Sequence, residues 1–83
     1  MIQFKTLETS QIETITTMMQ DFYAIDNYPI NMEQSKQLFK TFIENPNLGK
    51  AWLVNQEDEV VGYVILTFVF SFEYKGILAF LDE

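Results

Sequence analysis

The sequence has 83 residues, enough for one small domain or for part of a larger one. Hydrophobic residues make up 48% of the chain and aromatic residues 16%, which is too rich in core-forming side chains for intrinsic disorder. The formal net charge of −7 would repel a phosphate backbone, so the composition argues against nucleic-acid binding.

The residue types that are absent exclude several kinds of chemistry. With no cysteine and no histidine, the sequence excludes disulfides, thiolate metal sites and Ser-His-Asp triads, and we expect no bound metal. All five basic residues are lysines, and Gly49, Gly62 and Gly76 are too far apart for a phosphate-binding loop. Carboxylates, phenols, amines and hydroxyls remain as candidate chemical groups.

The first residues indicate a short strand. Apolar and polar side chains alternate over residues 2–6, which predicts a strand with one buried face. No signal-peptide hydrophobic region is present there, and the longest uncharged run, residues 60–72, is too short to span a bilayer. We therefore expect a cytoplasmic protein without membrane contact.

A first helix is predicted over about residues 11–25. Ser10 and Glu13 have the spacing of a capping box, and an apolar stripe follows at helical spacing. The stripe consists of Ile12, Ile15, Met19 and Phe22, widened by Met18 and Ile25. We interpret the two methionines as core filler rather than as a cofactor site.

A second helix follows a break at residues 26–29, where Pro29 disfavours helical backbone at Tyr28. Asn31 and Gln34 resemble a second capping box, with Asn in place of Ser or Thr. The breaker-rich segment 45–49 ends this helix.

Three strands joined by tight turns are predicted for the remainder. We place the strands at residues 51–55, 60–72 and 77–81, and the turns at 56–59 and 73–76. Gly62 suggests a bulge in the long strand, and Gly76 is available for a positive φ. Three carboxylates at 57–59 lack the spacing of a calcium loop, so we interpret them as a solvated turn.

The order of elements predicts an α+β fold: strand, helix, helix, then three antiparallel strands with the helices packed on the sheet. Residues 1–83 would form a single, partial domain, because the last strand is apolar and would leave an unprotected edge. Either another chain covers that edge or the sequence is a fragment.

Four stretches of the sequence resemble the N-terminal half of the GNAT superfamily of N-acetyltransferases. They are residues 18–29, 45–54, 61–68 and 71–83. The resemblance covers nearly the whole chain and agrees with the predicted order of elements. It implies an incomplete GNAT fold, whose parent transfers an acetyl group from acetyl-CoA to an amine of a small molecule or peptide.

The resemblance ends before the loop and helix that hold the acetyl-CoA pyrophosphate in that family. Such a site relies on successive backbone N–H groups at a helix N-terminus, and the scattered glycines here offer no replacement. We therefore expect a truncated acyltransferase that binds no acetyl-CoA and is inactive by itself.

The resemblance also implies site residues. Glu83 lies at the position of a carboxylate that removes a proton from the amine; the alternative is a solvated glutamate without a role. The loop between the helices would border the acceptor groove, with Phe22 and Tyr23 leading into it, Asp26 pairing with the amine and Tyr28 stacking on the substrate. Alternatively, Tyr28 only packs the loop against the sheet and contacts no substrate.

Trp52 and Tyr63 are interpreted as residues that pack on the faces of their strands rather than as ligand-binding residues.

The competing function is a non-enzymatic interaction module, in which the open last strand pairs with a partner by β-augmentation. In both cases we expect a homo-oligomer, formed through the exposed strand edge or sheet face. An acidic mimic of nucleic acid is a third idea, suggested by the net charge alone.

Overall fold

The structure, a computed structural model, describes residues 1–83. Its elements in chain order are β1 (Ile2–Thr6), a short 3-10 turn (Thr9–Gln11), α1 (Ile12–Ile25), α2 (Met32–Glu44), β2 (Gly49–Gln56), β3 (Glu59–Ser71) and β4 (Gly76–Leu81). This confirms the predicted α+β fold with one strand, two helices and three further strands.

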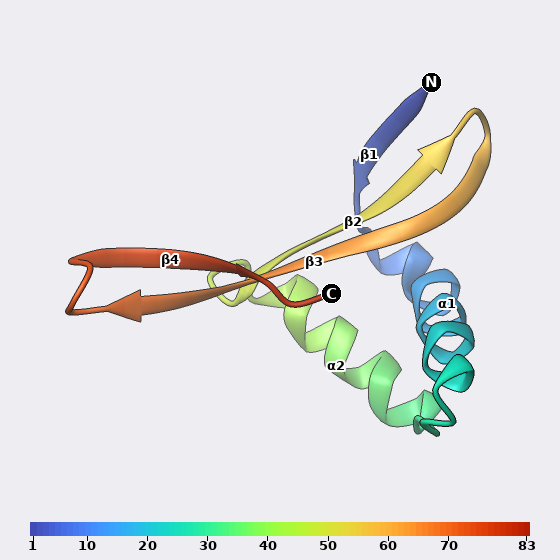
Figure 1. The fold of residues 1–83 in the computed structure, drawn as a ribbon, viewed down its shortest axis with the longest axis horizontal. Helices are drawn as coiled ribbons and strands as arrows, with labels where there is room; N and C mark the ends of the chain where they lie inside the picture. The colour runs from blue at the N-terminus through green and yellow to red at the C-terminus, as the bar shows by residue number, and fades with distance from the viewer.

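The four strands form one open antiparallel sheet in the order β1-β2-β3-β4. Figure 1 shows both helices on one side of this sheet, while the outer part of the β3–β4 hairpin extends past them. Neither helix combines the length and the apolar character needed to cross a membrane.

The two helices begin differently. The Asn31 side chain accepts a hydrogen bond from the Gln34 backbone N–H at 3.0 Å, which confirms the predicted cap of α2. The predicted capping box of Ser10 and Glu13 is wrong, because residues 9–11 form a 3-10 turn ahead of α1. There the Gln11 side chain accepts from the Glu8 backbone N–H at 3.1 Å instead.

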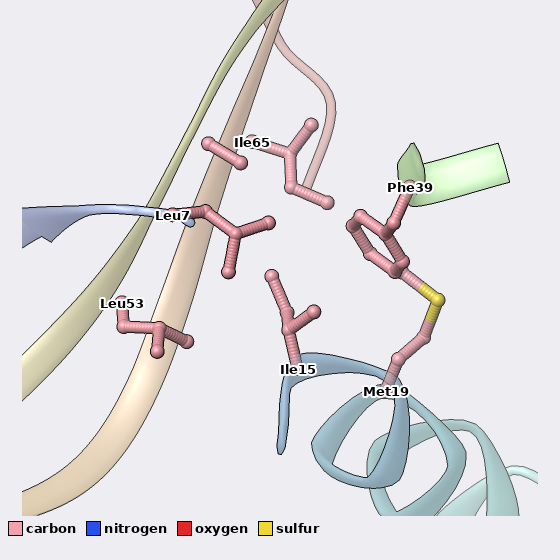
Figure 2. Close-up of a cluster of buried hydrophobic side chains, with 7 residues drawn as sticks. Leu7, Ile15, Met19, Phe39, Leu53 and Ile65 are labelled. Atoms are coloured by element: carbon pink, nitrogen blue, oxygen red, sulfur yellow. The ribbon is translucent and has the colours of Figure 1, made fainter. Parts of the chain in front are cut away.

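A small apolar core lies between the helices and the sheet, as Figure 2 shows. Its buried members are Leu7, Ile15, Met19, Phe39, Ala51, Leu53 and Ile65. Met19 contributes from α1 and points toward the Phe39 ring of α2, which confirms its interpretation as core filler.

The expected burial of one face of β1 is wrong. All five residues of β1 are exposed, and Phe4 keeps 62% of its surface accessible. β1 is an edge strand that pairs only with β2, and Figure 1 shows its N-terminal part extending beyond the two helices. With no helix over it, its apolar side chains stay in solvent.

The β2–β3 hairpin confirms the predicted bulge, whereas the β3–β4 turn places its positive φ on a different residue from the one expected. The β2–β3 register shifts between Val54 and Asn55, so that Val61 is the extra residue beside Gly62. In the β3–β4 turn the positive φ falls on Lys75, at 59°, and not on Gly76. Glycine is therefore not the residue that supplies the left-handed backbone of this turn.

Gly49 begins β2 at a point where the backbone is tightly enclosed. A Cβ atom there would lie 2.1 Å from the Leu66 carbonyl oxygen and 2.5 Å from Cζ of Phe42. Both distances are far below van der Waals contact, so only glycine fits between α2 and the sheet.

Candidate active site

A β-bulge just beyond β4 determines where Glu83 points. Thr67 and Phe80 are paired residues on the face of the sheet that the helices cover, so regular alternation would turn Asp82 toward the helices and Glu83 away. Instead, the backbone N–H groups of Asp82 and Glu83 both donate to the Ile65 carbonyl, at 2.8 and 3.3 Å. Two residues thus oppose one, and the extra residue brings Glu83 onto the helix-covered face.

The Glu83 carboxylate is held by two phenols from different elements. The Tyr23 hydroxyl of α1 donates to Oε2, and the Tyr63 hydroxyl of β3 donates to Oε1 at 2.9 Å. The Phe22 ring packs against the Tyr63 ring with centroids 5.6 Å apart. The two tyrosines that hold the Glu83 side chain therefore lie 60 and 20 positions before it in the sequence.

These contacts raise the pKa values of both phenols. The hydrogen bond to Glu83, together with burial and the negative charge of that carboxylate, raises the pKa of Tyr23 to about 12. Burial, followed by the hydrogen bond and charge of Glu83, also raises the pKa of Tyr63. Both phenols therefore remain protonated donors at neutral pH.

The held carboxylate keeps capacity for a further hydrogen bond. A carboxylate offers about four lone-pair positions, and each Glu83 oxygen accepts one phenol here. A third donor, such as an ammonium group, can therefore bind without displacing either tyrosine.

An apolar cavity of about 420 Å³ opens beside Glu83, between α2, the end of α1 and the sheet. Its apolar lining consists of Met19, Tyr23, Ile30, Leu38, Phe39, Phe42, Leu48 and Ile65. Its polar lining consists of Ser35, Thr41, Thr67, Asp82 and Glu83. The carboxylate thus stands in the wall of a pocket rather than in open solvent.

The structure brings together some of the residues proposed from sequence and not others. Tyr23 and Glu83 meet in the cavity wall, and Phe22 lies outside the cavity lining but packs on the Tyr63 ring. Asp26 and Tyr28 are exposed and are absent from the cavity lining, where Ile30 represents the loop between the helices.

Tyr63 is the site residue that sequence reasoning missed. Its position predicts strand-face packing, and its ring does pack against Phe22. Its hydroxyl, however, reaches Glu83, a contact that depends on the bulge at the end of β4. The available sequence signal was a tyrosine on the face of β3 that the helices cover, but this position does not indicate which group its hydroxyl contacts.

Residues 1–83 do not fit the pyrophosphate of acetyl-CoA. The chain has no arginine and no glycine-rich loop, and the Asn31 side chain already caps the N-terminus of α2.

No protein-family model and no curated protein matches the chain. Several chains of solved structures do match it, among them the following two. An integron cassette protein from the mobile metagenome of Cole Harbour Salt Marsh superposes with a TM-score of 0.93 and 31% identity over 98% of this chain. A possible acetyltransferase from Clostridium difficile 630 superposes with a TM-score of 0.80 and 16% identity over 99% of this chain.

The chain spans 53% of the cassette protein and 58% of the clostridial protein. The second likeness shows a shared fold, and the order of elements in this chain is the one predicted from its sequence. The chain thus has the fold found in just over half of a possible acetyltransferase.

Proposed function

We propose that this chain forms the acceptor side of an N-acetyltransferase, in which Glu83 takes a proton from the amine that receives the acetyl group. The observation that carries the proposal is the position of the Glu83 carboxylate, which accepts hydrogen bonds from two phenols in the wall of an apolar cavity. The fold shared with a possible acetyltransferase supports it.

The chemistry follows from the protonation state of an amine. An ammonium group has no lone pair, so it must lose a proton before its nitrogen can attack an acyl thioester carbonyl. Glu83 accepts that proton, the new N–C bond forms as the C–S bond breaks, and the leaving thiolate takes up the second proton that the nitrogen gives up. Tyr23 and Tyr63 are positioning residues, because they hold the carboxylate and do not touch the reacting atoms in this proposal.

The acetyl-CoA pyrophosphate would be bound by polypeptide other than residues 1–83. We therefore expect the 83-residue chain alone to show no rise in melting temperature with acetyl-CoA. A concentration-dependent rise would contradict this division of the enzyme.

The test is acetyl transfer by the protein expressed from its complete reading frame. The protein is mixed with acetyl-CoA and a panel of primary amines, and the released CoA thiol is measured. The proposal predicts CoA release that depends on the amine. If the complete protein neither binds acetyl-CoA nor releases CoA with any amine, the proposal is wrong.

A second candidate function, self-association, is favoured by the exposed β3–β4 hairpin. Phe70, Phe72 and Ile77 are 63%, 89% and 70% exposed, and β4 has no partner on its outer edge. Apolar side chains on an open strand edge favour pairing with a second copy of the chain.

Sedimentation equilibrium tests this association. We expect concentration-dependent dimers that increase with salt, because the net charge of −7 opposes association and salt screens it. Ile77→Lys should abolish the dimers, whereas Ile25→Lys, at a 77% exposed position on α1, should not. A wild-type protein that stays monomeric at all concentrations would rule out this function.

A further inference from the structure

The cavity beside Glu83 is negatively charged at one end, and the rest of its wall is apolar apart from the hydroxyls of Ser35, Thr41 and Thr67. The carboxylates of Asp82 and Glu83 lie where β4 ends, and no lysine lines the cavity. The negative charge of these two carboxylates therefore favours binding of a cation at that end, and the net charge of −7 adds to the attraction.

The apolar wall has a fixed inner part and an open rim. Met19, Phe39 and Ile65 belong to the buried core, so their positions are set by packing. Leu38 and Leu48 at the rim are 63% and 43% exposed, so a ligand that covers them removes apolar surface from water. The wall therefore favours a hydrophobic body attached to the cation.

We propose that the acceptor is a hydrophobic primary monoamine, an arylalkylamine or alkylamine without a carboxylate and without a second charge. This inference rests on the proposed function, whose amine substrate it specifies. The ammonium binds at Glu83 and Asp82, and the body lies along Phe39, Phe42 and Leu48.

Two other classes of amine fit poorly. An amino acid brings a carboxylate next to Asp82 and Glu83, where like charges repel and no lysine in the lining compensates. With its first ammonium at Glu83 and Asp82, a diamine places its second ammonium against a wall whose polar groups are the neutral hydroxyls of Ser35, Thr41 and Thr67. These hydroxyls repay less of the lost hydration than a carboxylate would. The volume of about 420 Å³ is in the range of small-molecule sites, so an aromatic ring can be accommodated.

Binding can be measured without acetyl-CoA, by NMR titration of the protein with four matched probes. These are 2-phenylethylamine, its neutral analogue 2-phenylethanol, its carboxylated analogue phenylalanine, and 1,4-diaminobutane. We expect 2-phenylethylamine to bind at least about tenfold more tightly than the other three and to shift Ile65 and Phe39 signals. Equal or tighter binding of phenylalanine or the diamine would overturn the inference.

A charge placed in the cavity gives a second readout. Thr41 is exposed and lines the cavity, so Thr41→Lys should fold and should weaken 2-phenylethylamine binding by about three- to tenfold. The matched control is Thr17→Lys, on an exposed position of α1 away from the cavity, which should leave binding unchanged. Equal effects of both substitutions would overturn the placement of the ammonium.

The same probes separate failure of this inference from failure of the proposed function. With the complete protein, CoA release that is faster with 1,4-diaminobutane or phenylalanine overturns the monoamine assignment and leaves acetyl transfer standing. Selective binding of 2-phenylethylamine without any CoA release supports the ligand class and contradicts the proposed function.

Discussion

Glu83 accepts hydrogen bonds from Tyr23 and Tyr63, two phenols that the chain brings together from α1 and β3. Because the charged carboxylate is a better acceptor than a neutral amide, its replacement should weaken both contacts. In Glu83→Gln we expect the pKa of Tyr23 to fall from about 12 toward its ordinary value of 10.

Ultraviolet titration of tyrosinate, with ring-carbon NMR to assign the residues, measures this change. Circular dichroism at neutral pH serves as the control that the variant is folded. An unchanged titration curve would mean that Glu83 does not hold the phenols in solution.

The raised phenol pKa values also make stability depend on alkaline pH. A phenol whose pKa is higher in the folded than in the unfolded state stabilises the fold fully below pH 10 and loses that contribution as pH rises through about 12. We expect the free energy of unfolding to fall more steeply over this interval in the wild type than in Tyr23→Phe/Tyr63→Phe. Urea unfolding at several alkaline pH values gives the two slopes, and parallel slopes would contradict the linkage.

At the scale of elements, the ends of the helices differ in how well local sequence predicts them. The Asn31 cap is a contact between residues three positions apart, and the structure contains it. The predicted Ser10 cap fails because the chain leaving β1 forms a 3-10 turn before α1 begins.

Alanine substitutions at the two positions should therefore have different effects. Asn31→Ala removes the acceptor of the Gln34 N–H and should lower the free energy of unfolding by about 1 kcal/mol. Ser10→Ala should change it by less than about 0.5 kcal/mol. Chemical denaturation measures both, and equal losses would restore the predicted capping box.

Gly49 and Gly76 provide a matched pair at the ends of strands. Gly49→Ala would force a Cβ atom against the Leu66 carbonyl and the Phe42 ring, so we expect a loss of at least about 2 kcal/mol or failure to fold. A Cβ atom at Gly76 meets nothing within 4 Å, so Gly76→Ala should be tolerated. Thermal melts compare the two variants, and a stable Gly49→Ala protein would show that α2 does not pack this closely on the sheet.

At the scale of the whole molecule, the order of elements could be predicted because each signal was local. Apolar periodicity, the Asn31 cap and the breakers at residues 45–49 act within a few positions, and all appear in the fold. The exposure of Phe4 could not be predicted in this way, because it depends on where the helices lie over the sheet.

The site shows the same limit. Resemblance pointed to Glu83 and Tyr23, but the contact of Tyr63 depends on a bulge that turns Glu83 toward the helices. Strand register is a property of the assembled sheet, and one extra residue reverses the face on which a side chain lies. Local pattern alone therefore assigned Tyr63 to packing.

The central claim is that Glu83 accepts the proton of the amine, and kcat/KM for acetyl transfer tests it most directly. The measurement compares the complete wild-type protein with Glu83→Gln and with Glu73→Gln, a matched change in the exposed β3–β4 turn. We predict that Glu83→Gln lowers kcat/KM by at least about 100-fold, the usual contribution of a general base, while Glu73→Gln leaves it unchanged. A folded Glu83→Gln protein that retains wild-type kcat/KM would contradict the account.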